Sequence, residues 1–308
     1  MSLRPHLDDL IELRHRAHAI GLASRHRVAS PLSGLYASVF RGQGMDYEET
    51  REYREGDEIR NMDWRVTART GVPHLKVFRE ERERAVVLCV DAGPHMHFGT
   101  RGTFKCVQAA RAAALLGWAA TSSHDRVGAV LYGDPSTGMQ YLRPTRSRAS
   151  FWRMLRALAG TSERGRPQGD GLLDALARLE RVAPTGVLLF VIGDLNREPS
   201  SLRVPLGRLA QRNDVVLLPV DDPADRDLPD VGRAVFQAPD GTRVEIDTHG
   251  ERGRRQYRAR WEARREALRT LGRRLGVPVI ALPTDGDAER VLADGLRKRC
   301  RAGPRVAA

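Results

Sequence analysis

Between residue 85 and the C-terminus, short continuous apolar runs alternate with longer segments in which apolar residues recur at helical spacing. The runs have the length of strands and almost no polar positions, which is typical of parallel strands buried on both faces. They are AVVLCVD (85–91), RVGAVLYGD (126–134), GVLLFVIGDL (186–195), VVLLPVDD (215–222) and VPVIALPT (277–284). The helical segments cover about residues 103–122, 150–160, 171–182, 201–212, 254–275 and 287–299.

Strands that alternate with helices of this length predict an α/β domain with a Rossmann-like, doubly wound and mostly parallel sheet. The segment GMQYLRP (138–144) follows the second strand closely, so we expect it to return beside that strand as a hairpin. Near the C-terminus, a Pro-Asp-Gly turn separates two β-type runs in GRAVFQAPDGTRVEID. This pattern predicts a β-hairpin inserted at about residues 232–247.

The first part of the chain is different, because charged residues and Gly-rich turns interrupt its apolar runs. Residues 7–20 have apolar spacing compatible with a helix. Strand-like runs occur at LYASVF (35–40) and HLKVF (74–78), around an intensely charged centre. We therefore expect a helix and a small charged β-rich module over residues 1–83, and the main domain over 84–302.

The composition is that of a folded protein, and the distribution of charge limits the classes of partner that we expect. Its net charge is +12 over 308 residues, which raises the question of nucleic-acid binding. Arginine and glutamate alternate in runs such as REERER (79–84), however, which is the pattern of salt-bridged surfaces. We do not expect nucleic acid to be the partner. No membrane span, no signal peptide and only three cysteines indicate a cytoplasmic protein.

Two of the predicted strands end in aspartate, at Asp91 and at Asp194. The carboxyl ends of parallel strands meet at one edge of a sheet, where ligands bind in doubly wound folds. Carboxylates there are well placed to hold a hard cation such as Mg²⁺. They are equally well placed to cap the turn or helix that follows each strand. The pattern alone leaves both interpretations open.

A stretch ahead of the first buried strand carries a family resemblance. REYREGDEIRNMDWR (51–65), ARTG (68–71) and the charged approach to AVVLCVDAG resemble a bacterial family known as domain of unknown function 58. The resemblance extends from about residue 36 to residue 300. It implies a von Willebrand A-like fold and association with a MoxR-type AAA+ ATPase.

The resemblance also implies where a metal-ion-dependent adhesion site would lie. In von Willebrand A domains, Asp-x-Ser-x-Ser follows the first strand, and a threonine and a second aspartate come from later loops. Here Asp91 and Asp194 match the two aspartates, whereas Gly93 and His95 replace the two serines, and Gly171 lies near the place of the threonine. We expect a degenerate site formed by Asp91, Asp194 and His95.

Two kinds of metal remain open for this site. The carboxylates suit Mg²⁺ or another divalent metal, but glycine supplies no side-chain oxygen for it. His95, with His97 two residues on, would suit a transition metal better than magnesium. Alternatively, both histidines are solvated polar residues of a loop, and no cofactor is bound.

The charged stretch before the first strand also has two interpretations. Arginine and aromatic residues dominate the energetics of binding surfaces, so we expect a partner-binding surface here. Its candidate residues are Arg51, Tyr53, Asp57, Arg60, Asp63 and Trp64. The same charges could instead form internal ion pairs, with Tyr53 and Trp64 buried as anchors.

The sequence contains neither a Gly-x-Ser-x-Gly nucleophile motif nor a phosphate-binding loop. We therefore favour a non-enzymatic protein-binding adaptor that works with a MoxR-type AAA+ ATPase on a client protein. The alternative is a metal-dependent hydrolase or nuclease that uses Asp91 and Asp194, perhaps with His95. A third carboxylate for such an enzyme could come only from Asp170 or Asp174 nearby.

Overall fold

The computed structural model describes residues 3–20, 22, 45–53, 62–80, 85–161, 165, 171–237 and 242–301. The chain divides into two compact units. The smaller unit is Arg27–Glu83, and the larger unit contains Met1–His26 together with Arg84–Ala308.

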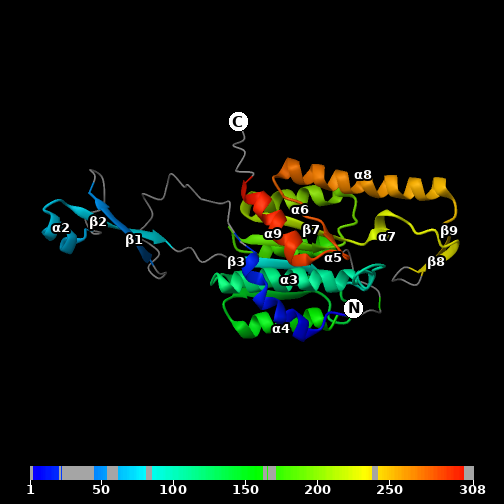
Figure 1. The fold of residues 1–308 in the computed structure, drawn as a ribbon, viewed down its shortest axis with the longest axis horizontal. Helices are drawn as coiled ribbons and strands as arrows, with labels where there is room; N and C mark the ends of the chain where they lie inside the picture. The colour runs from blue at the N-terminus through cyan, green and yellow to red at the C-terminus, as the bar shows by residue number, and fades with distance from the viewer. Residues whose placement is uncertain are drawn as a thin grey trace. The chain divides into compact units, whose positions relative to one another are not determined.

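The larger unit is built on a six-stranded sheet with the order β10-β7-β6-β3-β4-β5 (Figure 1). Its strands are β3 (Ala85–Asp91), β4 (Arg126–Tyr132), β5 (Gln140–Thr145), β6 (Leu188–Gly193), β7 (Asp214–Asp221) and β10 (Leu282–Pro283). All pairs are parallel except β4 with β5. Counted along the chain, this is the order 3-2-1-4-5-6 of doubly wound folds. The predicted fold class is confirmed.

Helices cover both faces of this sheet (Figure 1). One face packs against α3 (Lys105–Ser122), α4 (Arg148–Ala159) and α9 (Ala288–Arg301). The other packs against α5 (Gly171–Val182), α6 (Pro199–Arg212) and α8 (Glu251–Leu275). In β3, for example, Val86 and Leu88 face the first layer while Val87 and Cys89 face the second. This burial on both sides explains why the strand sequences are continuously apolar.

The N-terminal segment belongs to the larger unit. It forms α1 (Leu7–Glu12) and two short 3₁₀ helices, η1 (Leu13–His15) and η2 (Ala17–Ala19), in place of the continuous helix predicted over 7–20. Leu10, Ala17 and Ile20 are buried in the core layer of α3, and the Trp118 side chain donates a hydrogen bond to the Leu10 carbonyl. Among the described residues of this segment, apolar contacts attach Leu10, Ala17, Ile20 and Leu22 to the main domain, whereas the sequence grouped them with the module over residues 1–83.

The remaining elements lie near the ends of the main strands. A 3₁₀ turn η4 (Pro94–Met96) follows β3, and α7 (Pro223–Arg226) follows β7. The C-terminal hairpin is formed by β8 (Arg233–Gln237) and β9 (Arg243–Asp247), as predicted. β10 is much shorter than the run predicted over 277–284. Pro278 and Pro283 lack the amide hydrogen that a longer ladder would need.

The smaller unit contains an antiparallel pair, β1 (Met45–Glu52) and β2 (His74–Glu80), with α2 (Trp64–Thr70) between them in sequence. Asp63 caps α2 by accepting hydrogen bonds from the Arg65 and Val66 amides, and Gly71 ends the helix with a φ of 74°. The strand predicted over 35–40 lies outside the described residues. In the described part of the chain, no helix is long and apolar enough to cross a membrane.

Candidate functional site

Three neighbouring strands bring aspartates to one edge of the sheet. Asp91 ends β3, Asp194 directly follows β6, and Asp221 ends β7. Because β3 pairs with β6 up to Val90 and Ile192, the two aspartates predicted from the sequence come close together, as that prediction required. They line a cleft of about 230 Å³ together with His95, Tyr132 and Arg197.

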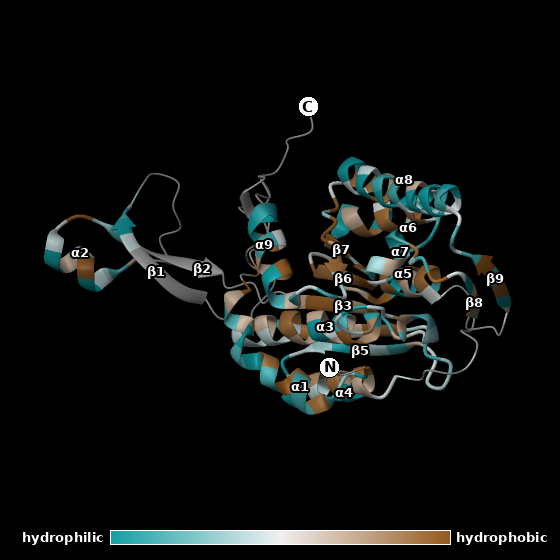
Figure 2. Cartoon of the chain, turned by 45° about the vertical axis from the view of Figure 1, so that its right-hand side comes forward, coloured by the Kyte–Doolittle hydropathy of each residue, from teal (hydrophilic) through white to brown (hydrophobic). Residues whose placement is uncertain are grey.

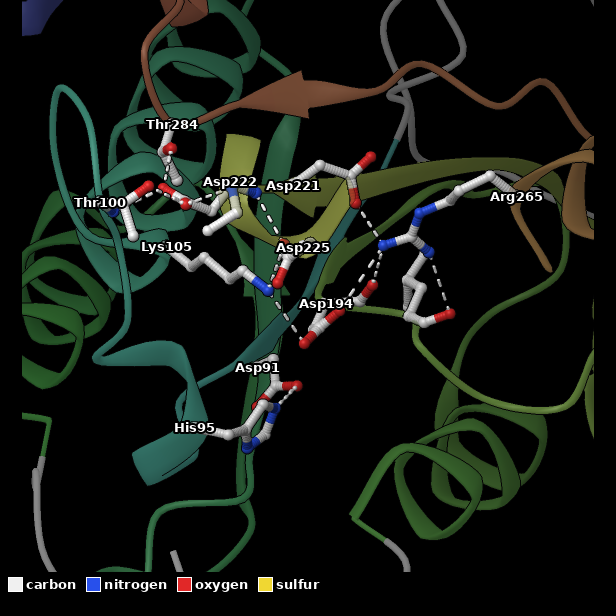
Figure 3. Close-up of polar contacts among 12 residues, drawn as sticks. Asp91, His95, Thr100, Lys105, Asp194, Asp221, Asp222, Asp225, Arg265 and Thr284 are labelled. Carbon is white, nitrogen blue, oxygen red and sulfur yellow. Dashed lines mark hydrogen bonds and ion pairs between the residues drawn. The ribbon is translucent and has the colours of Figure 1, made fainter. Parts of the chain in front are cut away.

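The Asp91 carboxylate is satisfied by its own loop. One oxygen accepts a hydrogen bond of 3.0 Å from the Gly93 amide, and the other lies 3.0 Å from Nε2 of His95 (Figure 3). Burial alone would lower the pKa of His95, but the Asp91 carboxylate outweighs burial and raises it. Burial, and then the charge of Asp91, hold the pKa of Tyr132 well above its usual range. Asp91 thus caps a turn, as one of the two interpretations expected.

The Asp194 carboxylate faces a buried lysine. Nζ of Lys105 lies 3.1 Å from Asp194 and 2.7 Å from Asp225, and its side chain is only 2% exposed (Figure 3). Burial would lower the pKa of Lys105, but the two carboxylates outweigh it and raise the pKa. The ammonium group therefore stays charged between them.

A second internal cation, Arg265 of α8, reaches the same edge of the sheet. Its guanidinium pairs with Asp221, donates a hydrogen bond of 2.8 Å to the Asp194 carbonyl, and lies 3.5 Å from the Asp194 carboxylate. Burial raises the pKa of Asp221 more than Arg265 lowers it. Figure 3 shows Lys105 and Arg265 approaching Asp194 from opposite sides.

Asp222 fixes the loops around this edge. Its buried carboxylate accepts hydrogen bonds from the amide and hydroxyl of Thr100 and from the hydroxyl of Thr284. Burial would raise the pKa of Asp222, but these hydrogen bonds outweigh it and lower the pKa. Three segments distant in sequence are thereby joined beside the cleft.

The residues of the cleft do not fit a magnesium ion of the adhesion-site type. Gly93 offers no side-chain oxygen, Gly171 lines the cleft where the threonine was expected, and Lys105 already neutralises Asp194. Over the residues that the structure describes, histidine, cysteine and acidic side chains form no group of three or more that could hold a metal ion. Asp174 lies on α5, and Asp170 lies outside the described residues.

The candidate partner-binding residues separate into different roles. Trp64 is 68% exposed, so it is not the buried anchor that one interpretation required. Asp63 is buried as the cap of α2. Arg51 and Tyr53 are half-buried, and Asp57 and Arg60 lie outside the described residues. Of the described candidates, Trp64 is the one presented fully to solvent.

Sequence reasoning missed Lys105, Arg265, Asp221 and Asp225. The run VVLLPVDD is a third apolar strand that ends in aspartate, and the same signal that singled out Asp91 and Asp194 would have found Asp221. Lys105 is one of only three lysines in a chain that otherwise uses arginine, which is a weaker signal. No pattern in the sequence indicates that Arg265 reaches this edge.

An exposed apolar face on the C-terminal hairpin was also missed. The cross-strand pairs Ala234–Ile246 and Phe236–Val244 place four apolar side chains on one face of the two-stranded ribbon. Phe236, Val244 and Ile246 are exposed. Figure 2 shows this hairpin at the periphery of the larger unit, beyond α8.

The chain is similar to several known proteins. Among solved structures, it is similar to the VWA domain of SpRpn10 (13% identity, TM-score 0.40, 73% of this chain and 99% of that one). It is also similar to a von Willebrand factor type A protein of Catenulispora acidiphila (12% identity, TM-score 0.38, 71% and 42%).

Among curated sequences, uncharacterized proteins of Mycobacterium bovis and Mycobacterium tuberculosis are each 32% identical to this chain over 289 residues. Each alignment covers 92% of this chain and 89% of the relative. The family model described as protein of unknown function DUF58 matches residues 49–267.

Proposed function

The chain belongs to the DUF58 family of proteins of unknown function, and on that premise we propose that it is a non-enzymatic, protein-binding adaptor with a degenerate metal-ion-dependent adhesion site. The observation that carries this proposal is the exposed apolar face of the hairpin, formed by Ala234, Phe236, Val244 and Ile246. A two-stranded ribbon is only marginally stable by itself, and exposed apolar patches typically mark interaction sites.

The base of this hairpin is anchored, and Phe236, Val244 and Ile246 on its apolar face are exposed among the residues that the structure describes. Thr248 is buried and joins the two ends of the hairpin through hydrogen bonds with the Val231 amide and the Gly232 carbonyl. Arg254 of α8 forms an ion pair of 3.0 Å with Asp230 just before β8. The fold thus holds the ribbon in a defined position for a partner. The exposed Trp64 of α2 is a second apolar contact for a partner, on the smaller unit.

The charges at the sheet edge support a function without catalysis. His95 and the Gly93 amide satisfy Asp91, and Lys105 and Arg265 neutralise Asp194. A hydrolase or nuclease that used Asp91 and Asp194 would need these carboxylates for a metal or for proton transfer. No observation favours that alternative.

We assign the partner as a MoxR-type AAA+ ATPase and the process as assembly or maturation of a client protein. The assignment rests on what the family resemblance implies. The sequence contains no phosphate-binding loop of its own, so the energy for such work would come from the ATPase.

The test is a binding measurement between the full chain and the MoxR-type ATPase of the same organism, by biolayer interferometry. We expect saturable binding that is the same in magnesium and in EDTA and that Asp91→Ala leaves unchanged. Absence of binding would contradict the partnership. Binding that requires a divalent metal, or phosphodiesterase activity that disappears in Asp91→Ala and Asp194→Ala, would contradict the metal-independent, non-enzymatic role.

A further inference from the structure

A second cleft, of about 500 Å³, lies on the larger unit between the N-terminal segment and the facing ends of α3 and α4. Its volume is in the range of small-molecule sites. Five basic side chains line it: Arg14, His15, His18, His124 and Arg148. None of its described lining residues is acidic. The lining therefore favours an anionic ligand.

The two arginines of this cleft have no carboxylate partner among the described residues. Arg148 is the first residue of α4, after the cap Ser147, and no described acidic side chain pairs with it. Nε of Arg14 donates a hydrogen bond of 3.0 Å to Nε2 of His15, which leaves the rest of its guanidinium for a ligand. By contrast, nearby Arg16 is held by Asp287 and Glu289.

Two tryptophans, Trp118 and Trp152, contribute flat apolar surface to the cleft. Trp118 is fixed in place, because its indole nitrogen donates to the Leu10 carbonyl and its ring packs edge-on against Phe151 at 4.7 Å. Trp152 follows Arg148 by one helical turn, so both project from the same side of α4. The cleft thus combines guanidinium groups for an anion with indole rings for a planar group.

We propose that this cleft binds a nucleoside phosphate, with the phosphate at Arg14 and Arg148 and the base against the tryptophans. Guanidinium groups form paired hydrogen bonds with phosphate oxygens, and bases stack on aromatic side chains regardless of their identity. The same chemistry is offered by a free mononucleotide and by the phosphorylated end of a single strand. This site goes beyond the proposed adaptor function and does not depend on it.

The test titrates the full chain with AMP, adenosine, inorganic phosphate and a 5′-phosphorylated trinucleotide, followed by tryptophan fluorescence and by calorimetry. We expect saturable binding of AMP, and at least about tenfold weaker binding of adenosine and of phosphate alone. Adenosine lacks the phosphate that would bind the arginines, and phosphate lacks the base that would stack on the tryptophans. Tighter binding of AMP than of the trinucleotide identifies a free mononucleotide as the ligand. Equal binding identifies a strand end.

Variants distinguish binding in this cleft from nonspecific attraction of the phosphate to a basic protein surface. Arg14→Gln and Arg148→Gln should each weaken AMP about tenfold, since each removes a charge-assisted contact. Trp152→Leu should weaken AMP but leave the weak binding of phosphate unchanged. The matched control is Arg260→Gln, an exposed arginine of α8 that should have no effect. No saturable binding of AMP, equal losses in Arg260→Gln and Arg148→Gln, or binding of a glutamate-rich peptide in place of AMP would overturn the proposal.

Discussion

Nζ of Lys105 lies 3.1 Å from a carboxylate oxygen of Asp194, at the edge of the sheet where the family resemblance implies a metal ion. The lysine comes from α3 and the aspartate from the end of β6, and Asp225 of α7 completes the arrangement at 2.7 Å. The chain therefore supplies its own cation for these carboxylates. This cation cannot be removed by a chelator, and it offers no open coordination position to a substrate.

Replacing Lys105 should lower stability strongly. Lys105→Met removes the buried ammonium and leaves Asp194 and Asp225 facing each other without it, which costs about 3–5 kcal/mol for comparable buried pairs. Urea denaturation followed by circular dichroism measures the difference. Lys298→Met, at an exposed lysine of α9, is the control and should change stability by less than about 0.5 kcal/mol. Equal stability of the two variants would show that Lys105 is not needed to balance these carboxylates.

Truncating the same lysine further should create a response to magnesium. Lys105→Ala leaves space between carboxylate oxygens, which are the ligands that Mg²⁺ prefers. A ligand that binds only the folded state raises its stability, so an excess of magnesium should raise the melting temperature of Lys105→Ala. The wild-type chain should melt at the same temperature with magnesium and with EDTA. A magnesium-dependent increase in the wild type would contradict the proposal that Lys105 takes the place of a metal at this edge.

His95 should stabilise the fold more at acidic than at alkaline pH. Its pKa is raised in the folded state, because Asp91 outweighs the effect of burial. A histidine with a raised pKa contributes stability that is fully present below about pH 6.5 and is lost as the pH rises through the folded-state value. The side chain is 37% exposed, so solvent screening keeps the contribution below about 1 kcal/mol. The difference in unfolding free energy between wild type and His95→Gln should therefore be larger at pH 5.5 than at pH 8.5. A difference that grows with pH would show that protonated His95 does not stabilise the fold.

Asp63 should act as a helix cap and not as a contact for a partner. Asp63→Ala removes the acceptor for the Arg65 and Val66 amides and should destabilise α2 by about 1 kcal/mol. Asparagine is an equally good cap, so Asp63→Asn should restore the wild-type behaviour. Hydrogen exchange at these two amides reports on the helix directly. Slow exchange in Asp63→Ala would show that the cap is dispensable.

The hairpin offers a matched pair of variants for the partner surface. Phe236→Asp places a charge on the apolar face, whereas Val235→Asp places the same charge on the opposite face of the same strand. Both side chains are exposed, so neither variant should change stability by much. We expect Phe236→Asp to weaken binding of the ATPase at least about tenfold and Val235→Asp to have little effect. If both variants bind equally well, the partner docks elsewhere.

The strands and their arrangement in one sheet could be predicted, because a strand that is buried on both faces has apolar residues at consecutive positions. AVVLCVD and VLLFVIG are apolar at every position before the aspartate, and both are central strands of the sheet. Because these two strands are adjacent and parallel, Asp91 and Asp194 come together at one edge of the sheet. The same logic failed for residues 277–284, where prolines in an apolar run reduce the edge strand to Leu282–Pro283.

The charge balance of the site could not be predicted, because it depends on side chains from helices distant in sequence. Lys105 and Asp194 are 89 positions apart, and Arg265 is 71 positions from Asp194. Nothing in helical periodicity tells which basic residue of a chain with 51 lysines and arginines enters the core. Three-dimensional packing decides whether two aspartates at a sheet edge hold a metal or are neutralised internally.

Helix α8 connects the surface that we assign to a partner with the interior of the fold. Arg254, near its start, holds Asp230 at the base of the hairpin, and Arg265, eleven residues later, pairs with Asp221 and reaches Asp194. At the rise of an α-helix these two arginines are about 16 Å apart on one continuous element. If a partner on the hairpin displaced this helix along its axis, the arginine pairing at the sheet edge would change with it. By thermodynamic reciprocity, a ligand whose binding altered the pairing of Arg265 would then change the affinity of the hairpin for its partner, by the same factor by which the partner changes the affinity for that ligand.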